Sequence, residues 1–293
     1  MKVSYYPGCT LKTKAKNLED SAISSMAALG VELDELPRWN CCGAVHSLAD
    51  DDLIHHVAPV RDLVRAMERG SGKLVTLCSM CYNTLARANI IMREDEARRR
   101  TINEFMREEK DYHGEVEVVH FLNFLRDEVG WEKVSERVKR PLHGLKVAAY
   151  YGCTLLRPKD VAIEAPGHPE ILNEFLRALG AVPVDYSGSS LCCGSYQILM
   201  NPEAAVDAVS QVLGGALGAG AEAMVISCPL CEFNLSGSQK GLLEEGRISR
   251  ELPLFYFTQL LAVALGLDEK ACRLDLNEKG SVELLRGKNL VFC

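Results

Sequence analysis

Short apolar runs alternate with helical patterns along this chain. Residues 3–8 and 145–152 are apolar, brief and rich in Val and Tyr, as buried strands are. Residues 74–77 and 223–227 predict two further strands. Helices are predicted at residues 53–69 and 202–217. Another helix is predicted where apolar residues recur at three- and four-residue intervals before a glycine: Leu172, Phe175, Leu176 and Leu179, before Gly180.

The first half of the chain carries a matching helix pattern near its start. Gly30 takes the place of Gly180 as the C-cap, Asn17 is expected to cap the first turn, and Asp20 lies near the positive end of the helix dipole. Each half closes with a related segment, at residues 118–124 and 254–260, that is predicted to pass from strand into helix. The same order of elements is therefore expected twice.

This order predicts an α/β fold of two pseudo-symmetric repeated domains, each a mainly parallel sheet flanked by helices. Pro141 and Gly144 break the pattern between the two copies. We therefore expect one domain at residues 1–142 and a second at residues 143–293.

Composition and charge narrow the class of protein. The content of 47% hydrophobic and 25% charged residues is typical of a protein with a packed core and excludes a disordered or fibrous chain. The net charge of −7 gives no positive field for nucleic acid or an anionic membrane. No apolar run approaches a membrane span, and the first ten residues are too polar for a signal peptide. A cytoplasmic location without membrane insertion is expected.

The 12 cysteines carry the candidate chemistry. In a reducing compartment so many cysteines favour metal binding over disulfides. Ten of them form two sets of five with the same order, a single cysteine, a CC pair and a CxxC pair: Cys9, Cys41, Cys42, Cys78 and Cys81, then Cys153, Cys192, Cys193, Cys228 and Cys231. The two gaps within a set are 31 and 35 residues in the first and 38 and 34 in the second. Cys272 and Cys293 belong to neither set, and we take them as incidental.

The predicted strands place these cysteines at one sheet edge. Residues 74–77 and 223–227 run directly into the two CxxC pairs, and helical patterns begin just after them. The carboxyl ends of parallel strands are where ligands collect, and helix N-termini there favour thiolates. Packing alone gives no reason to repeat CC and CxxC, and a thioredoxin-like dithiol leaves the CC pairs unexplained. An iron–sulfur cluster accommodates such ligands, whereas adjacent cysteines are awkward for tetrahedral zinc. Zinc in one half stays the alternative.

At these residues the sequence resembles the CCG-domain proteins, and among them it is most similar to the B subunits of heterodisulfide reductases. The resemblance implies that each half binds a noncubane [4Fe-4S] cluster. It assigns one cluster to the first set of five cysteines and the other to the second set. It also implies an oxidoreductase of methanogenesis that reductively cleaves the coenzyme M–coenzyme B heterodisulfide between the clusters. Electrons are then expected from a ferredoxin-like C subunit together with a flavin-bearing A subunit, in a complex that extends to hydrogenase or formate dehydrogenase subunits.

Such a substrate is anionic, so an acidic protein needs local positive charge around the clusters. The candidates follow the single cysteines or flank the first CC pair: Lys12, Lys14, Lys16, Arg38, Arg157 and Lys159. His46 also flanks that pair and is a candidate proton donor to a departing thiolate.

Other cofactor sites are not expected in this chain. Neither CxxC is followed by the third cysteine of a ferredoxin motif. Gly218, Gly220 and Ala223 fit a loose dinucleotide fingerprint but precede a predicted strand, whereas the fingerprint must follow one. We therefore expect no flavin or nicotinamide site. Two other functions stay open, an electron-transfer subunit of another oxidoreductase, of the succinate, lactate or glycolate type, and a zinc-holding structural protein.

Overall fold

The structure is a computed structural model that describes residues 1–44, 52–165 and 167–291. The described strands form two four-stranded sheets: β1 (Lys2–Tyr6), β2 (Glu32–Glu35), β3 (Lys73–Thr76) and β4 (Glu117–His120) in one, and β5 (Lys146–Ala149), β6 (Val182–Val184), β7 (Ala223–Ile226) and β8 (Leu254–Tyr256) in the other. All neighbouring strands are parallel, and the strand orders are β2-β1-β3-β4 and β6-β5-β7-β8. The predicted α/β fold of two repeated parallel sheets is therefore confirmed.

Helices flank both sheets. Those of the first half are α1 (Lys16–Ala28), η1 (Leu53–His56), α3 (Val57–Glu68), α4 (Ser79–Glu94), α5 (Glu96–Phe105), α6 (Phe121–Phe124), η2 (Leu125–Val129) and α7 (Trp131–Arg137). Those of the second half are η3 (Lys159–Val161), α8 (Ile171–Ala178), α9 (Pro202–Gly218), α10 (Pro229–Glu244), α11 (Phe257–Ala264), α12 (Glu269–Cys272), η4 (Leu274–Leu276) and α13 (Lys279–Gly287). Every helix among the described residues is too short or too polar to cross a membrane.

The helix termini agree with the expected glycines but not with the expected cap. Gly30 and Gly180 follow α1 and α8 with φ of 78° and 81°, a conformation that glycine adopts without strain. Asn17 was expected to cap α1, and this prediction is wrong, because the N-cap is Ala15 and Asn17 lies inside the helix. The Asn17 amide instead donates to Asn277 Oδ1 at 3.5 Å, in the second half of the chain. Asp20 forms an ion pair with Arg273, also in the second half.

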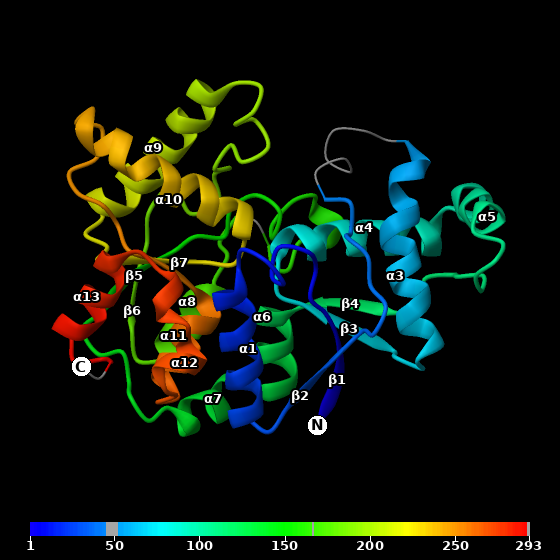
Figure 1. The fold of residues 1–293 in the computed structure, drawn as a ribbon, viewed down its shortest axis with the longest axis horizontal. Coiled ribbons are helices and arrows are strands. Elements are labelled where there is room, and N and C mark those ends of the chain that lie inside the picture. Colours follow the sequence, from blue (N-terminus) through cyan, green and yellow to red (C-terminus); the bar gives the residue numbers. More distant parts are fainter. Residues whose placement is uncertain (45–51, 166, 292–293) are drawn as a thin grey trace.

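The two halves pack against each other through their helices. Helix α1 of the first half lies along α11 of the second, and the two helices meet at the middle of the molecule (Figure 1). Ser21 Oγ bonds Thr258 Oγ1 at 2.7 Å in this contact, and Thr258 Oγ1 donates to Leu18 O at 2.9 Å. In the reciprocal contact α7 packs on α8, where Trp131 Nε1 donates to Glu174 Oε2 at 3.0 Å. The first helix of each half therefore packs on a closing helix of the other.

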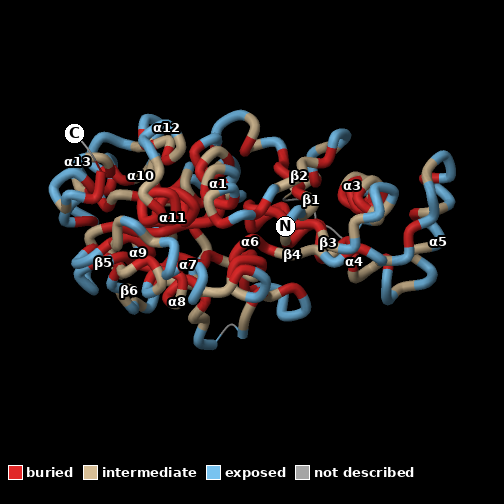
Figure 2. Tube along the Cα trace, turned by 90° about the horizontal axis from the view of Figure 1, so that it is seen from below, coloured by how far each residue is buried: buried red, intermediate tan, exposed pale blue. Residues whose placement is uncertain are grey.

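The core is continuous across this junction. Figure 2 shows buried residues running through α11 and the strands between the two ends of the molecule, whereas α5 at the far end of the first half is largely exposed. Every residue of α11 is buried. The halves are thus joined by shared apolar packing rather than by a linker.

Candidate functional site

Each cysteine set lies at the carboxyl edge of its sheet. In the first half Cys9 follows β1, the CC pair follows β2, and Cys78 ends β3 as the N-cap of α4. In the second half Cys153 follows β5, the CC pair follows β6, and Cys228 is the N-cap of α10. The strands β1 and β3, like β5 and β7, are the neighbours at which the strand order reverses, the usual ligand crevice of an open parallel sheet.

The sulfur atoms of each set contact one another. Cys9 Sγ lies 3.5 Å from Cys41 Sγ, and Cys42 Sγ lies 3.5 Å from Cys81 Sγ. In the second half Cys193 Sγ lies 3.4 Å from Cys231 Sγ. Cys153 and Cys192 lie close enough to shift each other's pKa, as do the two cysteines within the second CC pair and within each CxxC pair, and Cys41 lowers the pKa of Cys42.

The two sets are joined through their CxxC pairs. Cys78 and Cys228, both buried, lie close enough across the junction of the halves that Cys228 raises the pKa of Cys78 and Cys78 lowers that of Cys228. The ten thiols therefore form one row, which we call the thiol row, in the order Cys9, Cys41, Cys42, Cys81, Cys78, Cys228, Cys231, Cys193, Cys192 and Cys153. Its centre is buried, and its two ends reach the surface, since Cys9 and Cys41 are exposed and Cys153 and Cys192 are half-buried.

Paired tyrosines hold the two CC loops. Tyr6 Oη donates to Asn40 O and Tyr150 Oη donates to Leu191 O, both at 2.8 Å, and each acceptor immediately precedes a CC pair. Tyr6 and Tyr150, each three residues before the single cysteine of its set, are therefore structural counterparts. Both side chains are fully buried, so that each bond is shielded from water.

Glycines bring the first loop close to the CxxC sulfur. Gly8 and Gly152 precede the single cysteines and have φ of 74° and 65°. A Cβ atom on Gly8 would lie 2.8 Å from Cys81 Sγ, and one on Gly152 would lie 3.6 Å from Cys231 Sγ. The approach in the first half leaves no room for any side chain.

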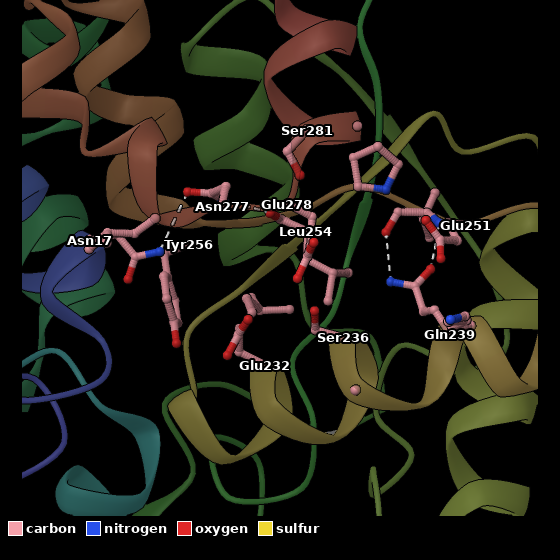
Figure 3. A pocket seen from close by; sticks show the side chains of 17 residues that line it. Asn17, Glu232, Ser236, Gln239, Glu251, Leu254, Tyr256, Asn277, Glu278 and Ser281 are labelled. Carbon is pink, nitrogen blue, oxygen red and sulfur yellow. Dashed lines mark hydrogen bonds between the residues drawn. The ribbon is translucent and has the colours of Figure 1, made fainter.

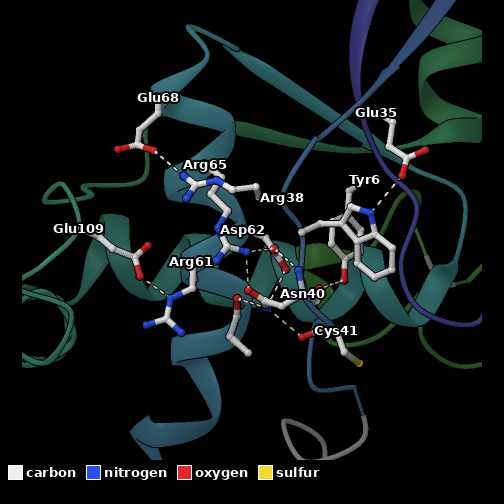
Figure 4. Close-up of polar contacts among 12 residues, drawn as sticks. Tyr6, Glu35, Arg38, Asn40, Cys41, Arg61, Asp62, Arg65, Glu68 and Glu109 are labelled. Carbon is white, nitrogen blue, oxygen red and sulfur yellow. Dashed lines mark hydrogen bonds and ion pairs between the residues drawn. The ribbon is translucent and has the colours of Figure 1, made fainter.

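A buried carboxyl group anchors the first CC loop (Figure 4). Asp62 Oδ1 accepts from the Asn40 backbone N–H at 2.9 Å, and Asp62 Oδ2 accepts from Asn40 Nδ2 at 3.2 Å. Arg65 donates to Asn40 Oδ1 at 2.8 Å and lies 3.5 Å from Asp62. Burial raises the pKa of Asp62 to about 7, although the Asn40 bond and the two arginines Arg65 and Arg61 act to lower it.

The thiol row contains favoured thiolate positions. Hydrogen bonds from Cys153 and Cys193 lower the pKa of Cys192 to about 2, and the Gly194 N–H, 3.3 Å from the sulfur, contributes to this. The pKa of Cys42 is likewise well below its usual value because the Cys41 and Cys81 thiols bond to it. Metal ligands must be thiolates, so each half offers at least one ligand that is ionised at neutral pH.

Four further residues flank the middle of the row and were not predicted. Tyr82 follows the first CxxC and packs edge-on against His120, whose Nε2 donates to Leu77 O at 3.1 Å. Burial lowers the pKa of His120 to about 4. At the corresponding places in the second half stand Glu232, after the second CxxC, and Tyr256, at the end of β8. Their positions, one residue after CxxC and at the strand end of each closing segment, were the available signal.

The predicted cationic residues are only partly available to a ligand. Lys12 lies 2.7 Å from Glu19 and 2.6 Å from Glu35, so two carboxylates already balance its charge. Arg38 lies 3.9 Å from Glu68. The side chains at the remaining predicted positions are exposed: Lys14, Lys16, Arg157 and Lys159.

The remaining predictions concern His46, Cys272 and Cys293. His46 and Cys293 lie outside the described residues. Cys272 is buried in α12, apart from the thiol row, where its thiol donates to Leu267 O at 3.7 Å. Its environment is that of a small packed residue.

The donor set fits a multinuclear cluster by its chemistry. Ten thiols, several of them ionised, are the soft ligands that iron–sulfur clusters require. An iron–sulfur cluster distributes its thiolate ligands over several metal atoms, whereas a tetrahedral zinc ion takes four ligands.

Comparison with known proteins identifies close counterparts. A family model described as "Cysteine-rich domain", CCG, matches residues 3–86 and 147–236. The 8-methylmenaquinol:fumarate reductase membrane anchor subunit of Wolinella succinogenes is 32% identical, over 94% of this chain and 95% of that protein. The B subunit of a ferredoxin/F420H2-dependent CoB-CoM heterodisulfide reductase from Methanosarcina acetivorans is 29% identical, over 97% and 96%. A protein of Archaeoglobus profundus that is named as similar to heterodisulfide reductase B subunits is 30% identical, over 92% of each.

A solved structure shares the fold at low sequence identity. The crystal structure of a hypothetical protein from Helicobacter pylori superposes with a TM-score of 0.71 at 13% identity. It covers 94% of this chain, which spans about half the length of that protein, 51%. The likeness concerns the arrangement of the two sheets alone.

Proposed function

The chain belongs to the CCG cysteine-rich domain family, and from this membership we propose that it is the disulfide-cleaving iron–sulfur subunit of a multisubunit oxidoreductase. Its similarity to heterodisulfide reductase B subunits extends over nearly the whole chain. The proposed substrate is the coenzyme M–coenzyme B heterodisulfide, the molecule in the names of these relatives. In this proposal residues 1–142 and 143–293 are the two CCG domains.

One observation carries the proposal: the thiol rows of the two halves meet at Cys78 and Cys228. Cleavage of a disulfide to two thiols consumes two electrons and two protons. When bound, two neighbouring clusters would supply one-electron chemistry at both sulfurs of one substrate. A pair of centres in contact serves such a reaction better than two isolated ones.

The proposed ligands follow the two cysteine sets. Cys9, Cys41, Cys42, Cys78 and Cys81 would hold one noncubane [4Fe-4S] cluster, and Cys153, Cys192, Cys193, Cys228 and Cys231 would hold the other. The buried CxxC thiols are shielded from water, which protects reduced sulfur from side reactions. The tyrosine bonds from Tyr6 and Tyr150 fix the CC loops before any ligand binds, which lowers the cost of ordering the site.

Exposed cations near the outer ends of the row would attract the anionic substrate. Arg157 and Lys159 follow Cys153, and Lys14 and Lys16 follow Cys9. Lys12 contributes less, because Glu19 and Glu35 already neutralise it. We retain His46 as the proposed proton donor on its sequence position beside the first CC pair.

Partner proteins complete the proposed reaction. We propose that the electron donors are a ferredoxin-like C subunit together with a flavin-bearing A subunit, in a cytoplasmic complex that includes hydrogenase or formate dehydrogenase subunits.

The Wolinella relative favours a second candidate function. That protein is named as a subunit of a methylmenaquinol:fumarate reductase, and its identity of 32% exceeds that of the two B-subunit relatives reported above. In this second proposal the same clusters pass electrons between a quinol and a partner's catalytic site, and no disulfide is cleaved here.

Metal analysis of anaerobically purified protein tests the cluster proposal. Two four-iron clusters give about eight iron and eight sulfide per chain without zinc. About four iron and one zinc would leave a single cluster and a structural metal, and would overturn the two-centre mechanism. With eight iron present, oxidation of the dithionite-reduced protein by the heterodisulfide favours the first function, whereas oxidation only by a quinone favours the second.

A further inference from the structure

A cavity of about 370 Å³ lies against α10, the helix that contains Cys231 (Figure 3). Helix α10, strand β8 and helix α13 form its walls, and Asn17 of α1 reaches it from the first half. Two of its lining residues are near the cysteines: Glu232 directly follows Cys231, and Tyr256 is close enough to Cys228 and Cys231 for their charges to raise its pKa. Its size suits a small organic molecule.

The lining of this cavity carries an excess of negative charge. Glu232, Glu251 and Glu278 contribute carboxylates, and Lys240 is the single cation among the described lining residues. None of the three carboxylates forms a side-chain hydrogen bond or ion pair within the described part of the chain. Burial raises the pKa of Glu232, and the nearby charge of Glu278 raises it further. Two such carboxylates are stabilised when a positive charge lies between them.

A hydroxyl group on a buried residue also faces the cavity and has no partner among the described residues. Ser281 is 2% exposed, and its side chain points into the cavity (Figure 3). Its Oγ atom has no hydrogen bond among the residues that the structure describes, whereas its backbone N–H donates to Glu278 O at 2.9 Å. This hydroxyl group opens onto the cavity, where it is available to bond a polar atom of a ligand.

In the first half, a lysine of the chain itself balances the carboxylates of a comparable cavity. A smaller cavity, of about 260 Å³, lies there between β4 and Tyr82, and it is lined by Glu117 and Glu128. Lys73 lies 3.5 Å from Glu117 and is also ion-paired with Glu128. The second half has no such internal lysine between its carboxylates within the described residues, so its cation must come from outside.

A metal ion does not fit this role. No group of three acidic, histidine or cysteine residues in the described chain is arranged to hold one, so the carboxylates are too dispersed for direct coordination. Ile226, Leu254 and Leu276 add apolar surface that a hydrated ion would leave unused. An organic cation would contact both the carboxylates and the apolar side chains of the cavity.

We propose that this cavity binds a small organic molecule with a primary ammonium group on an apolar carbon skeleton. The ammonium group has three hydrogen-bond donors, which Glu232, Glu278 and Ser281 would accept. The apolar skeleton would pack on Leu254 and Leu276. Neither the iron–sulfur clusters nor the disulfide reaction enter this inference.

Two glycines of α10 provide a matched test. Gly237 lines the cavity and Gly241, one helical turn further on, does not. A Cβ atom would meet nothing within 4 Å at either position, so both accept a side chain. Gly237→Trp should fill the cavity, and Gly241→Trp should only cover the surface.

Benzylamine is the probe, and uncharged benzyl alcohol is its isosteric control. Titration calorimetry on the anaerobically purified, cluster-loaded protein should show benzylamine binding that is weakened at least about ten-fold by Gly237→Trp and left unchanged by Gly241→Trp. Glu278→Gln should weaken benzylamine about ten-fold, and benzyl alcohol should bind at least about ten-fold more weakly than benzylamine.

Three results would overturn the proposal. They are absence of benzylamine binding to the unsubstituted protein, equal binding of benzyl alcohol, and unchanged affinity in Gly237→Trp. If both tryptophan variants lose binding through misfolding, Glu278→Gln is the deciding test. It removes the charge of an exposed side chain without changing its size. An unchanged affinity in that variant would contradict the charge argument.

Discussion

Cys78 and Cys228 interact across the junction of the two halves, where each shifts the pKa of the other. Each is the N-cap of a helix that follows a central strand, so the contact joins the two sheets at their equivalent edges. Any electron or ligand at one half is therefore adjacent to the other half.

The cysteine ligands are tested by one substitution in each half. Cys42→Ala and Cys193→Ala each remove a buried thiol from one set, so each should lower the iron content by about half. Cys272→Ala is the control, because Cys272 is equally buried but lies outside the thiol row. Iron and sulfide analysis decides the matter, and full iron in either of the first two variants would disprove the symmetric assignment.

Asn83 ties the first CxxC helix to the second half. Its amide donates to Thr154 O at 2.8 Å and to Arg157 O at 2.7 Å, on the loop after Cys153. Asn83→Ala leaves both carbonyls without this donor and should cost about 1–3 kcal/mol in the free energy of unfolding, measured by urea denaturation.

Phe233 is the matched control for Asn83, since it occupies the same place after the second CxxC but is 64% exposed. Phe233→Ala should change the free energy of unfolding by less than about 0.5 kcal/mol. Equal effects of the two substitutions would show that the contact from Asn83 does not stabilise the junction.

Alanine substitutions of Gly8 and Gly152 distinguish the effect of backbone strain from that of steric crowding at a cysteine sulfur. Alanine at either position adopts a positive φ, which costs about 1 kcal/mol in both variants. Only Gly8→Ala also places a methyl group 2.8 Å from a cysteine sulfur, that of Cys81. Gly8→Ala should therefore lose iron, whereas Gly152→Ala should keep it and lose only stability. Iron content and urea midpoints measure the two effects, and equal iron in both variants would contradict the steric argument.

Asp62 predicts a pH dependence of stability. Its pKa is about 7 in the folded protein against 3.8 for the ordinary carboxyl group, so the folded state binds this proton more tightly than the unfolded chain does. Stability should therefore fall as the pH rises from about 4 to about 7, by at most about 4 kcal/mol. The charges that face the carboxyl group are those of Arg61, Arg65 and Glu109.

Asp62→Asn removes this titration and should flatten the decline. Urea denaturation of both proteins at several pH values measures the difference between them. If the curves of the variant and the unsubstituted protein stay parallel between pH 4 and 7, Asp62 does not carry the effect.

The sequence allowed the sheet edges to be predicted because local signals are sufficient there. Short apolar runs ended at Cys78 and Cys228, and parallel strands place such residues together whatever the rest of the fold does. The contact between these two residues could not be predicted, because the repeat does not specify which faces of the halves meet. Lys12 shows the same limit. Its partner Glu35 is distant in sequence and is brought near by the pairing of β1 with β2.

Asn17 was misread for a related reason. Asparagine near the start of a helical pattern usually caps it. Here the amide is buried at the junction and bonds Asn277 of the other half, so tertiary packing replaced the local role. The flanking pairs Tyr82–His120 and Glu232–Tyr256 were not predicted, because they differ in residue type between the repeats.

The packing of α1 on α11 and of α7 on α8 resembles an isologous dimer interface, in which the same surface is used twice about a two-fold axis. Here the two copies are one polypeptide, so they are always present in equal number and never have to associate. A homodimer must place the same residues on both sides of its axis. The fused arrangement lifts that constraint, and it allows one side to carry Tyr82 and His120 while the other carries Glu232 and Tyr256.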